Sequence, residues 1–321
     1  MKHNILVTGA SGFVGGAVIE RLQADGEKSV IAVVRGEGRL SAPVSIARIE
    51  TFSPQTQWQP HLLNVDTVIH CGARVHVMND TEADPLGAFR RVNVEGTINF
   101  ARQAAAANVR RFIFISSIKV NGEGTLPGNP YTAADVPAPA DPYGISKSEA
   151  EQSLKQIAQM TGMEVVIIRP VLVYGPGVKA NFLSMMRWLD KGVPLPFGAI
   201  NNRRSLVSID NLVDLIVICI DHPQAANQTF LVSDGEDLST TALLSRMARS
   251  LGKPARLIPV PSWILECGAK ALGKATLSQR LCGSLQVDIE KTRALLNWTP
   301  PVSVDDALDK TARHFRMNPT K

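Results

Sequence analysis

The chain has 321 residues, of which 45% are hydrophobic and 20% charged, the composition of an ordinary folded protein. Its formal net charge of +5 suits anionic ligands, but the Lys and Arg are scattered along the chain, so nucleic-acid binding is not expected. Strand-like residues begin at about His3, leaving no room for a signal peptide, and the longest apolar run, Leu215–Ile220, is too short to cross a bilayer. We therefore expect a cytoplasmic protein without a membrane span.

The first half of the chain alternates short β-branched runs with helical stretches, which predicts a doubly wound α/β fold with a parallel sheet. The apolar runs are nearly continuous, as expected for strands buried on both faces. Strands are predicted at residues 4–8, 29–34, 67–70, 111–116 and 165–169, and helices at residues 13–23, 89–107 and 143–160. Residues 122–141 are rich in Gly, Pro and Ala and predict a surface loop that runs directly into the third helix.

After Arg169-Pro170 the segments become shorter and are punctuated by Pro and Gly. We interpret residues 1–170 as one domain and residues 171–321 as mainly a smaller α/β substrate-binding domain, with a segment near 205–235 returning to the first. Residues 261–281 have amphipathic spacing, for which we expect a core-facing or lid helix rather than a membrane-surface helix.

Four cysteines are spread along the chain: Cys71, Cys219, Cys267 and Cys282. None belongs to a C-x-x-C motif or lies beside a histidine cluster. We interpret them as reduced core thiols and expect no metal site.

A glycine-rich loop, Thr8–Gly15, follows the first predicted strand and opens the first helix. There the backbone must turn tightly and approach a pyrophosphate, which the N–H groups of the helix N-terminus would bind. Its spacing is G-x-x-G-x-x-G rather than the G-x-G-x-x-G of typical Rossmann dehydrogenases. We predict a Rossmann-type dinucleotide site with contacts from Gly9, Ser11, Gly12, Phe13, Val14 and Gly15.

The second strand ends at Arg35, where such folds usually carry an acid that binds the adenosine ribose. Arginine pairs instead with a 2′-phosphate, so NADP(H) is favoured, while NAD(H) stays possible. Arg39 is a second candidate cation, and Glu37 is a rival ribose ligand. The alternative is that Arg35 is only a solvated strand end.

Tyr143 and Lys147 lie four residues apart, so a helix would place them on one face. A phenol titrates near pH ~10, and an adjacent ammonium would favour its phenolate form. This spacing also arises by chance on exposed helices. In a chain with a dinucleotide loop, however, it indicates acid–base chemistry coupled to hydride transfer.

These residues resemble the extended short-chain dehydrogenase/reductase family, in its nucleotide-sugar epimerase, dehydratase and reductase branch. The resemblance rests on the glycine loop and on segments 68–73, 92–97, 115–117, 143–147, 169–176 and 295–300, the last with Asn297 in place of the usual glycine. It implies catalytic roles for Ser117, Tyr143 and Lys147, and a packing role for His70. It also implies cofactor contacts from Tyr143, Lys147, Cys71, Gly72, Ala73, Asn93, Ser116, Pro170 and Val173.

By the same resemblance, the substrate is a UDP-sugar held by Ser117, Lys119, Tyr143, Asn181, Arg204 and Arg280, and the protein is a homodimer. Ile118 and Lys119 occupy the positions where sugar dehydratases carry an acidic pair, which leaves 4-keto reduction or 4-epimerisation. Arg35 favours NADPH-dependent reduction of a UDP-4-keto-6-deoxy-N-acetylhexosamine to a UDP-N-acetylquinovosamine-type or 4-epimeric sugar for surface polysaccharide synthesis. The alternatives are an NAD-dependent 4-epimerase of a UDP-N-acetylhexosamine or lipid-linked amino sugar, and a noncatalytic dinucleotide sensor.

Overall fold

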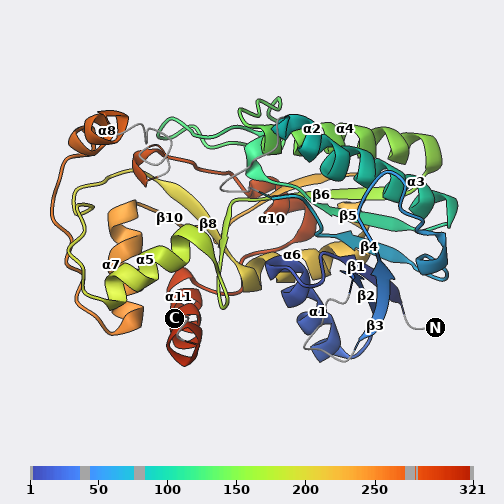
Figure 1. The fold of residues 1–321 in the computed structure, drawn as a ribbon, viewed down its shortest axis with the longest axis horizontal. Helices are drawn as coiled ribbons and strands as arrows, with labels where there is room; N and C mark the ends of the chain where they lie inside the picture. Colours follow the sequence, from blue (N-terminus) through green and yellow to red (C-terminus); the bar gives the residue numbers. More distant parts are fainter. Residues whose placement is uncertain (1–2, 37–43, 76–83, 272–278, 280, 319–321) are drawn as a thin grey trace.

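The computed structural model describes residues 3–36, 44–75, 84–271, 279 and 281–318. A large sheet of seven parallel strands has the order β3-β2-β1-β4-β5-β6-β9, and its strands are β1 (Asn4–Thr8), β2 (Ser29–Arg35), β3 (Ser45–Ile49), β4 (Thr67–His70), β5 (Arg111–Ile115), β6 (Glu164–Pro170) and β9 (Thr229–Val232) (Figure 1). This is a doubly wound Rossmann-type order extended by one strand. The predicted fold class is therefore confirmed.

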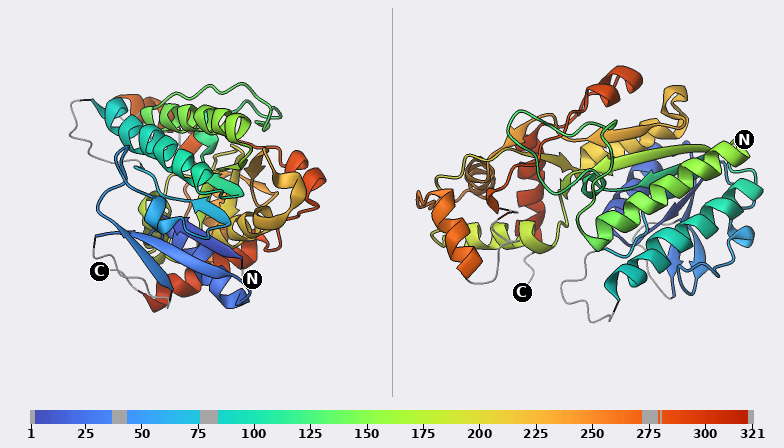
Figure 2. Two further views of the ribbon diagram at one scale, coloured as in Figure 1. Left: turned by 90° about the vertical axis from the view of Figure 1, so that its right-hand side faces the viewer. Right: turned by 90° about the horizontal axis from the view of Figure 1, so that it is seen from above.

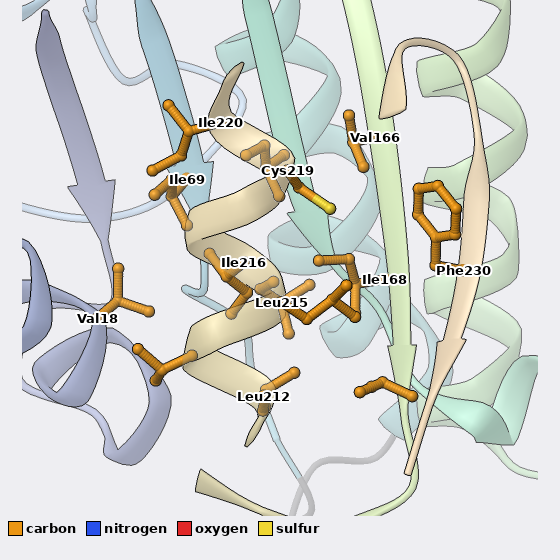
Figure 3. Packing of buried hydrophobic residues seen from close by; sticks show 14 of the residues in the cluster. Val18, Ile69, Val166, Ile168, Leu212, Leu215, Ile216, Cys219, Ile220 and Phe230 are labelled. Carbon is orange, nitrogen blue, oxygen red and sulfur yellow. The ribbon is translucent and has the colours of Figure 1, made fainter. Parts of the chain in front are cut away.

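Both faces of the large sheet are covered by helices. The helices α1 (Phe13–Asp25) and α6 (Ile209–Asp221) pack on one face, where Figure 3 shows the apolar side of α6 lying against the strands. The helices α3 (Thr97–Ala106) and α4 (Pro142–Thr161) cover the other face. Two cores thus enclose the strands, which explains their nearly continuous apolar sequences.

The helix predicted over residues 89–107 is three consecutive segments: α2 (Pro85–Phe89), the π-helical η2 (Arg90–Gly96) and α3. Wider π turns recur at functional sites in proteins. The π segment contains Asn93, whose side chain is buried. Strand β3 was absent from the prediction, because its five residues include two exposed positions at its start and no continuous apolar run.

A second, three-stranded sheet has the order β10-β8-β7 and contains β7 (Leu172–Tyr174), β8 (Arg204–Ser208) and β10 (Asp237–Leu238). The helices α5 (Ala180–Asp190), α7 (Thr240–Leu251) and α11 (Val304–Met317) surround its core. After β8 the chain enters α6 and then β9, which pairs with β6 in the large sheet. The right-hand view in Figure 2 shows this separation into a larger and a smaller layer system.

The remaining described elements are short: the 3-10 turns η1 (Gln59–His61), η3 (Ile118–Val120) and η4 (Pro223–Ala225), and the helices α8 (Ser262–Ala271) and α10 (Glu290–Leu296). Residues 122–141 form an irregular loop into α4, as predicted. Asn297 ends α10 in the left-handed conformation with φ +48°, which accounts for an asparagine at a position where the resemblance has glycine.

Helix α8 differs from its prediction. Its described residues include no buried one, so the core-facing alternative is wrong for them, and the lid alternative stays a prediction. Its Cys267 is exposed, whereas Cys219 is buried in the core, so the expectation of core thiols holds for the latter and fails for the former. Within the described ranges, the structure contains no helix with the length and apolarity that a bilayer crossing requires.

Candidate active site

The glycine loop lies between the end of β1 and the start of α1, and three of its glycines are required by close backbone contacts. Gly9 has φ +69°, and a Cβ atom there would lie 2.8 Å from the backbone carbon of Cys71. A Cβ atom on Gly15 would lie 2.3 Å from the Gly9 carbonyl oxygen, and one on Gly12 would lie 3.0 Å from it. The Gly12 N–H also donates to that oxygen at 2.8 Å. The loop is therefore a tight turn that only glycine permits.

Helix α1 begins at Phe13 without a side-chain cap, because its N-cap residue is Gly12. Ser11 and Gly12 are exposed, and Phe13 and Val14 are half-buried. No capping side chain thus accepts a hydrogen bond from the first backbone N–H groups of α1, as in helix N-termini that bind phosphate groups. These residues fit a dinucleotide pyrophosphate.

The end of β4 lies directly against this loop. The Gly72 N–H donates to the Thr8 hydroxyl at 3.2 Å, and the Thr8 hydroxyl is 2.6 Å from Nδ1 of His70. The second ring nitrogen of His70 is 3.0 Å from the Thr97 hydroxyl. Burial holds the pKa of His70 well below its ordinary value, with a smaller contribution from the Lys147 charge. His70 is therefore a neutral packing residue, in agreement with its predicted role.

Asn93 connects the chain after β4 to the helix that carries Tyr143. Its side-chain oxygen accepts from the Arg74 N–H at 2.8 Å, and its amide donates to the Arg74 carbonyl and to the Ser146 hydroxyl, each at 3.0 Å. Asn93 thus supports the segment containing Cys71, Gly72 and Ala73. It does not cap a helix.

Arg35 is the exposed last residue of β2. Across the sheet, Arg35 is paired with Ile49 of β3. Arg48, which also belongs to β3, donates to the Gly36 carbonyl at 2.7 Å. A second cation therefore lies beside the turn that follows Arg35. Glu37 and Arg39 lie outside the described residues, so the contacts of this turn with a 2′-phosphate or a ribose stay a prediction.

Tyr143 lies in the first turn of α4, whose start is fixed by Asp141 and Pro142. The Asp141 carboxylate caps the helix by accepting from the Gly144 N–H at 2.7 Å, and proline is favoured at the first helical position. The ring of Phe89 contacts the Tyr143 ring edge-on, with centroids 6.1 Å apart. This start of α4 holds the phenol next to Ser117, at the end of β5.

The Ser117 side chain interacts with the Tyr143 phenol. Burial and, to a smaller extent, the negative charge of Asp141 raise the pKa of Tyr143 to about 12, although the contact with Ser117 opposes this rise. The pKa therefore moves away from neutrality, contrary to the sequence-based expectation. The physical reason is that desolvation of the phenolate outweighs the favourable contacts around it.

Lys147 lies one helical turn after Tyr143, and its side chain is almost fully buried. Its ammonium donates to the Ile115 carbonyl at 2.8 Å and lies 4.3 Å from the centre of the Phe114 ring. Burial lowers the pKa of Lys147 to about 8, although Cys71 and Glu151 favour its charged form. The ammonium is thus fixed on β5, between the end of the sheet and α4.

Ser116 belongs to a buried polar network behind these residues. Its hydroxyl donates to Glu151 at 2.5 Å, and Glu151 forms a two-pronged ion pair with Arg169, the shortest contact being 2.6 Å. Arg169 also donates to the Asn121 side chain at 2.9 Å. The Ser116 side chain is therefore engaged in the core, and its contact with a cofactor stays a prediction. The network ties α4 to β5 and β6.

The predicted substrate residues have different surroundings. Lys119 forms ion pairs with Asp141 and, at 3.1 Å, with Glu123. Arg204 donates to the Gly283 carbonyl at 3.0 Å, and Asn181 is exposed in the first turn of α5. Arg280 lies outside the described residues.

Two site residues were missed from the sequence: Asp141 and Glu151. An Asp-Pro pair before a helix is a recognisable N-cap pattern, so Asp141 could have been found. Glu151 carries no such pattern, because its partner Arg169 is 18 positions away and on a different element. Val171 and Pro170 are buried at the end of β6, and Val173 is half-buried in β7, where contact with a nicotinamide stays a prediction.

The fold and the site together define an α/β enzyme of the dinucleotide-binding class. Residues 5–233 match the model of a family described as the NAD dependent epimerase/dehydratase family. The chain belongs to this family.

Three relatives illustrate the range of the family. The chain is 50% identical to a UDP-glucose 4-epimerase of Vibrio cholerae over 98% of this chain and 96% of the relative. It is 27% identical, over 98% and 96%, to the N-acetyl-alpha-D-glucosaminyl-diphospho-ditrans,octacis-undecaprenol 4-epimerase of Escherichia coli O157:H7. Its fold resembles that of the UDP-glucuronic acid 4-epimerase of Bacillus cereus in complex with NAD, with a TM-score of 0.79, 21% identity and coverage of 98% and 96%.

Proposed function

We propose that this protein is an NAD-dependent 4-epimerase of a UDP-linked hexose. The observation that carries the proposal is the 50% identity, over nearly the whole chain, to a protein named UDP-glucose 4-epimerase. It favours the epimerase alternative over the 4-ketoreductase that Arg35 suggested. The interacting pair of Ser117 and Tyr143, with Lys147 one turn further along α4, supplies the chemistry that the reaction needs.

The dinucleotide would lie along Gly9, Gly12 and Gly15 with its nicotinamide end toward Lys147. A bound NAD would supply the acceptor for the hydride of sugar C4 and the donor for its return. Tyr143 in its phenolate form accepts the proton of the C4 hydroxyl as C4 is oxidised to the ketone, and the resulting phenol returns that proton when the ketone is reduced. Ser117 donates a hydrogen bond to the same sugar oxygen and holds it at the phenol.

The residues after Ser117 argue against sugar dehydration. That reaction needs a carboxylic acid and a carboxylate at these two positions, by the resemblance described above. Ile118 is apolar and buried, and Lys119 is a cation paired with two carboxylates. Neither side chain can protonate a leaving hydroxyl and remove a C5 proton, so the chemistry stays at C4.

The decisive experiment offers the purified protein two kinds of substrate. UDP-glucose and UDP-N-acetylglucosamine are supplied without added cofactor, and the sugar products are followed by NMR. A 4-epimer formed without net change in NADH absorbance supports the proposal. Failure to form any 4-epimer, with stoichiometric NADPH consumption on a UDP-4-keto-6-deoxy-N-acetylhexosamine, would instead establish the reductase.

A second candidate function, the NADPH-dependent 4-ketoreductase, is favoured by one observation: Arg35 ends β2 in the position of the expected ribose-binding acid. Dinucleotide titrations test it directly. If Arg35 binds a 2′-phosphate, Arg35→Ala weakens NADPH binding by about tenfold or more and leaves NADH binding unchanged. Arg48→Ala, which removes the neighbouring cation, serves as the control for general loss of positive charge. If Arg35→Ala changed NADPH and NADH binding equally, the NAD-dependent epimerase would be the better interpretation.

A further inference from the structure

The exposed face of α8 is apolar, which reverses the usual orientation of a surface helix. Trp263 is 64% exposed and Ile264 is 43% exposed. At helical spacing they share one side of α8 with further exposed residues, Cys267, Gly268 and Ala271. The half-buried side carries Ser262, Leu265, Glu266 and Ala269. The outward side of the helix thus carries two exposed large apolar side chains, Trp263 and Ile264, together with Lys270.

The segments that lead to α8 extend this apolar surface. Residues 195–199 run parallel to residues 257–261, with bridges between Leu195 and Leu257 and between Ala199 and Pro261. Ile258 is 50% exposed within this pair, just before the helix begins. Exposed apolar groups gathered on one element and its approach segment indicate an interaction surface. Figure 1 places α8 at the opposite end of the molecule from β3 and α1.

The charges around this surface are mainly positive. Lys191, Arg256 and Lys270 are exposed, and Lys253 pairs with Asp190 at 3.4 Å. Glu266 is the acid of α8, and it belongs to the half-buried side. An exposed indole, with Lys270 on the same helix and Arg256 just before the approach segment, matches the interface of an anionic bilayer, where tryptophan lies at headgroup depth and basic side chains meet lipid phosphates.

A second copy of this chain fits the surface less well. A stable dimer interface buries about 800 Å² on each partner, whereas this face offers one ten-residue helix with two large apolar side chains, Trp263 and Ile264, and Ile258 before it. Two such faces would also bring like charges together. An anionic lipid surface has neither problem, since each basic side chain near it strengthens binding by about fivefold.

We propose that α8 and the approach segment ending at Pro261 dock this protein on the surface of an anionic phospholipid bilayer. Ten residues are too few to cross the hydrocarbon, so the helix would lie in the headgroup region. Trp263 and Ile264 enter the interface, and Lys191, Arg256 and Lys270 face the lipid phosphates. This docking is independent of which sugar the enzyme takes.

Co-sedimentation with vesicles tests the proposal on the full-length protein. Vesicles containing phosphatidylglycerol should bind it, pure phosphatidylcholine vesicles should bind it weakly, and salt should release it. Trp263→Glu with Ile264→Glu should lower binding by about tenfold or more. Leu63→Glu is the matched control, because Leu63 is an exposed leucine, 74% accessible, on the large-sheet side.

Turnover of soluble UDP-glucose by the same variants separates this proposal from the proposed function. The double variant should retain it, because α8 carries no residue of the catalytic or dinucleotide site. Absence of wild-type binding to the anionic vesicles would overturn the proposal. Unchanged vesicle binding by the double variant would also overturn the proposal. The same conclusion would follow if the double variant kept its lipid binding and instead changed its oligomeric mass, measured by light scattering.

Discussion

Lys119 forms an ion pair with Asp141, the carboxylate that caps the helix carrying Tyr143. One Asp141 oxygen accepts from the Gly144 N–H, and the other accepts from the Lys119 ammonium. The same carboxylate raises the pKa of Tyr143. We expect the Lys119 ammonium to offset part of this negative charge, which makes the Tyr143 phenol a weaker acid. This gives Lys119 an electrostatic role distinct from its predicted contact with substrate.

Replacing Lys119 should shift the pH dependence of catalysis. In Lys119→Met, the uncompensated Asp141 charge raises the pKa of Tyr143 further, so the rising limb of kcat moves to higher pH by about 0.5 to 1 unit. Asp141→Asn should move it to lower pH, and Lys119→Arg should leave it in place. The measurement is kcat and KM across pH. A change in KM alone, with an unmoved pH profile, would assign Lys119 to substrate binding instead.

Tyr143→Phe should remove turnover while sparing dinucleotide binding. The substitution deletes the hydroxyl that exchanges the proton and keeps the ring that packs against Phe89, so kcat should fall by about 10²- to 10⁴-fold. Dinucleotide binding, followed by fluorescence, should change little. Tyr131→Phe is the control, because its hydroxyl donates to the Gly124 carbonyl in the loop before α4. Undiminished turnover in Tyr143→Phe would remove the tyrosine from its role.

Five strands of the large sheet, β1, β2, β4, β5 and β6, were predictable because each is a mostly buried apolar run. β1 and β4 have the predicted bounds, and the helix predicted from Tyr143 begins one residue earlier, at Pro142. β3 was not predictable from its own residues, since Ile46 is 42% exposed and the strand is completed by its pairing with β2. Long-range pairing thus supplies what local pattern lacks.

The candidate site was likewise predictable where it depends on local sequence and not where it depends on distant elements. Gly9, Tyr143 and Lys147 are recognisable because their chemistry depends on local spacing. The protonation energetics were not recognisable, since the desolvation that raises the pKa of Tyr143 and lowers that of Lys147 depends on packing by distant elements. Helix α8 shows the limit of periodicity, because amphipathic spacing does not say which side faces the protein.

Gly9→Ala should damage the dinucleotide site far more than an ordinary left-handed glycine would. Gly9 and Gly26 have similar backbone angles, φ +69° and +66°, but a Cβ at Gly9 would lie 2.8 Å from the Cys71 backbone, whereas at Gly26 it would meet nothing within 4 Å. Gly26→Ala should therefore cost only about 1 kcal/mol of unfolding free energy. Gly9→Ala should cost more and weaken NAD binding. Equal losses in the two variants would show that close packing of the loop on β4 is unimportant.

The buried ammonium of Lys147 should make stability rise with pH above neutrality. Burial lowers its pKa from the ordinary 10.5 to about 8, so between these values the unfolded chain holds a proton that the folded protein has released. Unfolding then takes up a proton, and the free energy of unfolding increases with pH, by at most about 1.4 kcal/mol per pH unit. Below about pH 8 both states are protonated and the slope vanishes.

Lys147→Met isolates this contribution, because methionine fills similar space beside Phe114 and carries no charge. Urea denaturation of both proteins, without added dinucleotide, should show wild type gaining stability relative to the variant between about pH 8 and pH 10. The Ile115 carbonyl loses its donor in the variant at every pH, so that loss displaces the two curves without changing their slopes. Parallel curves through this window would mean that Lys147 keeps its ordinary pKa in the folded protein, and that burial on β5 does not tune the ammonium beside the catalytic tyrosine.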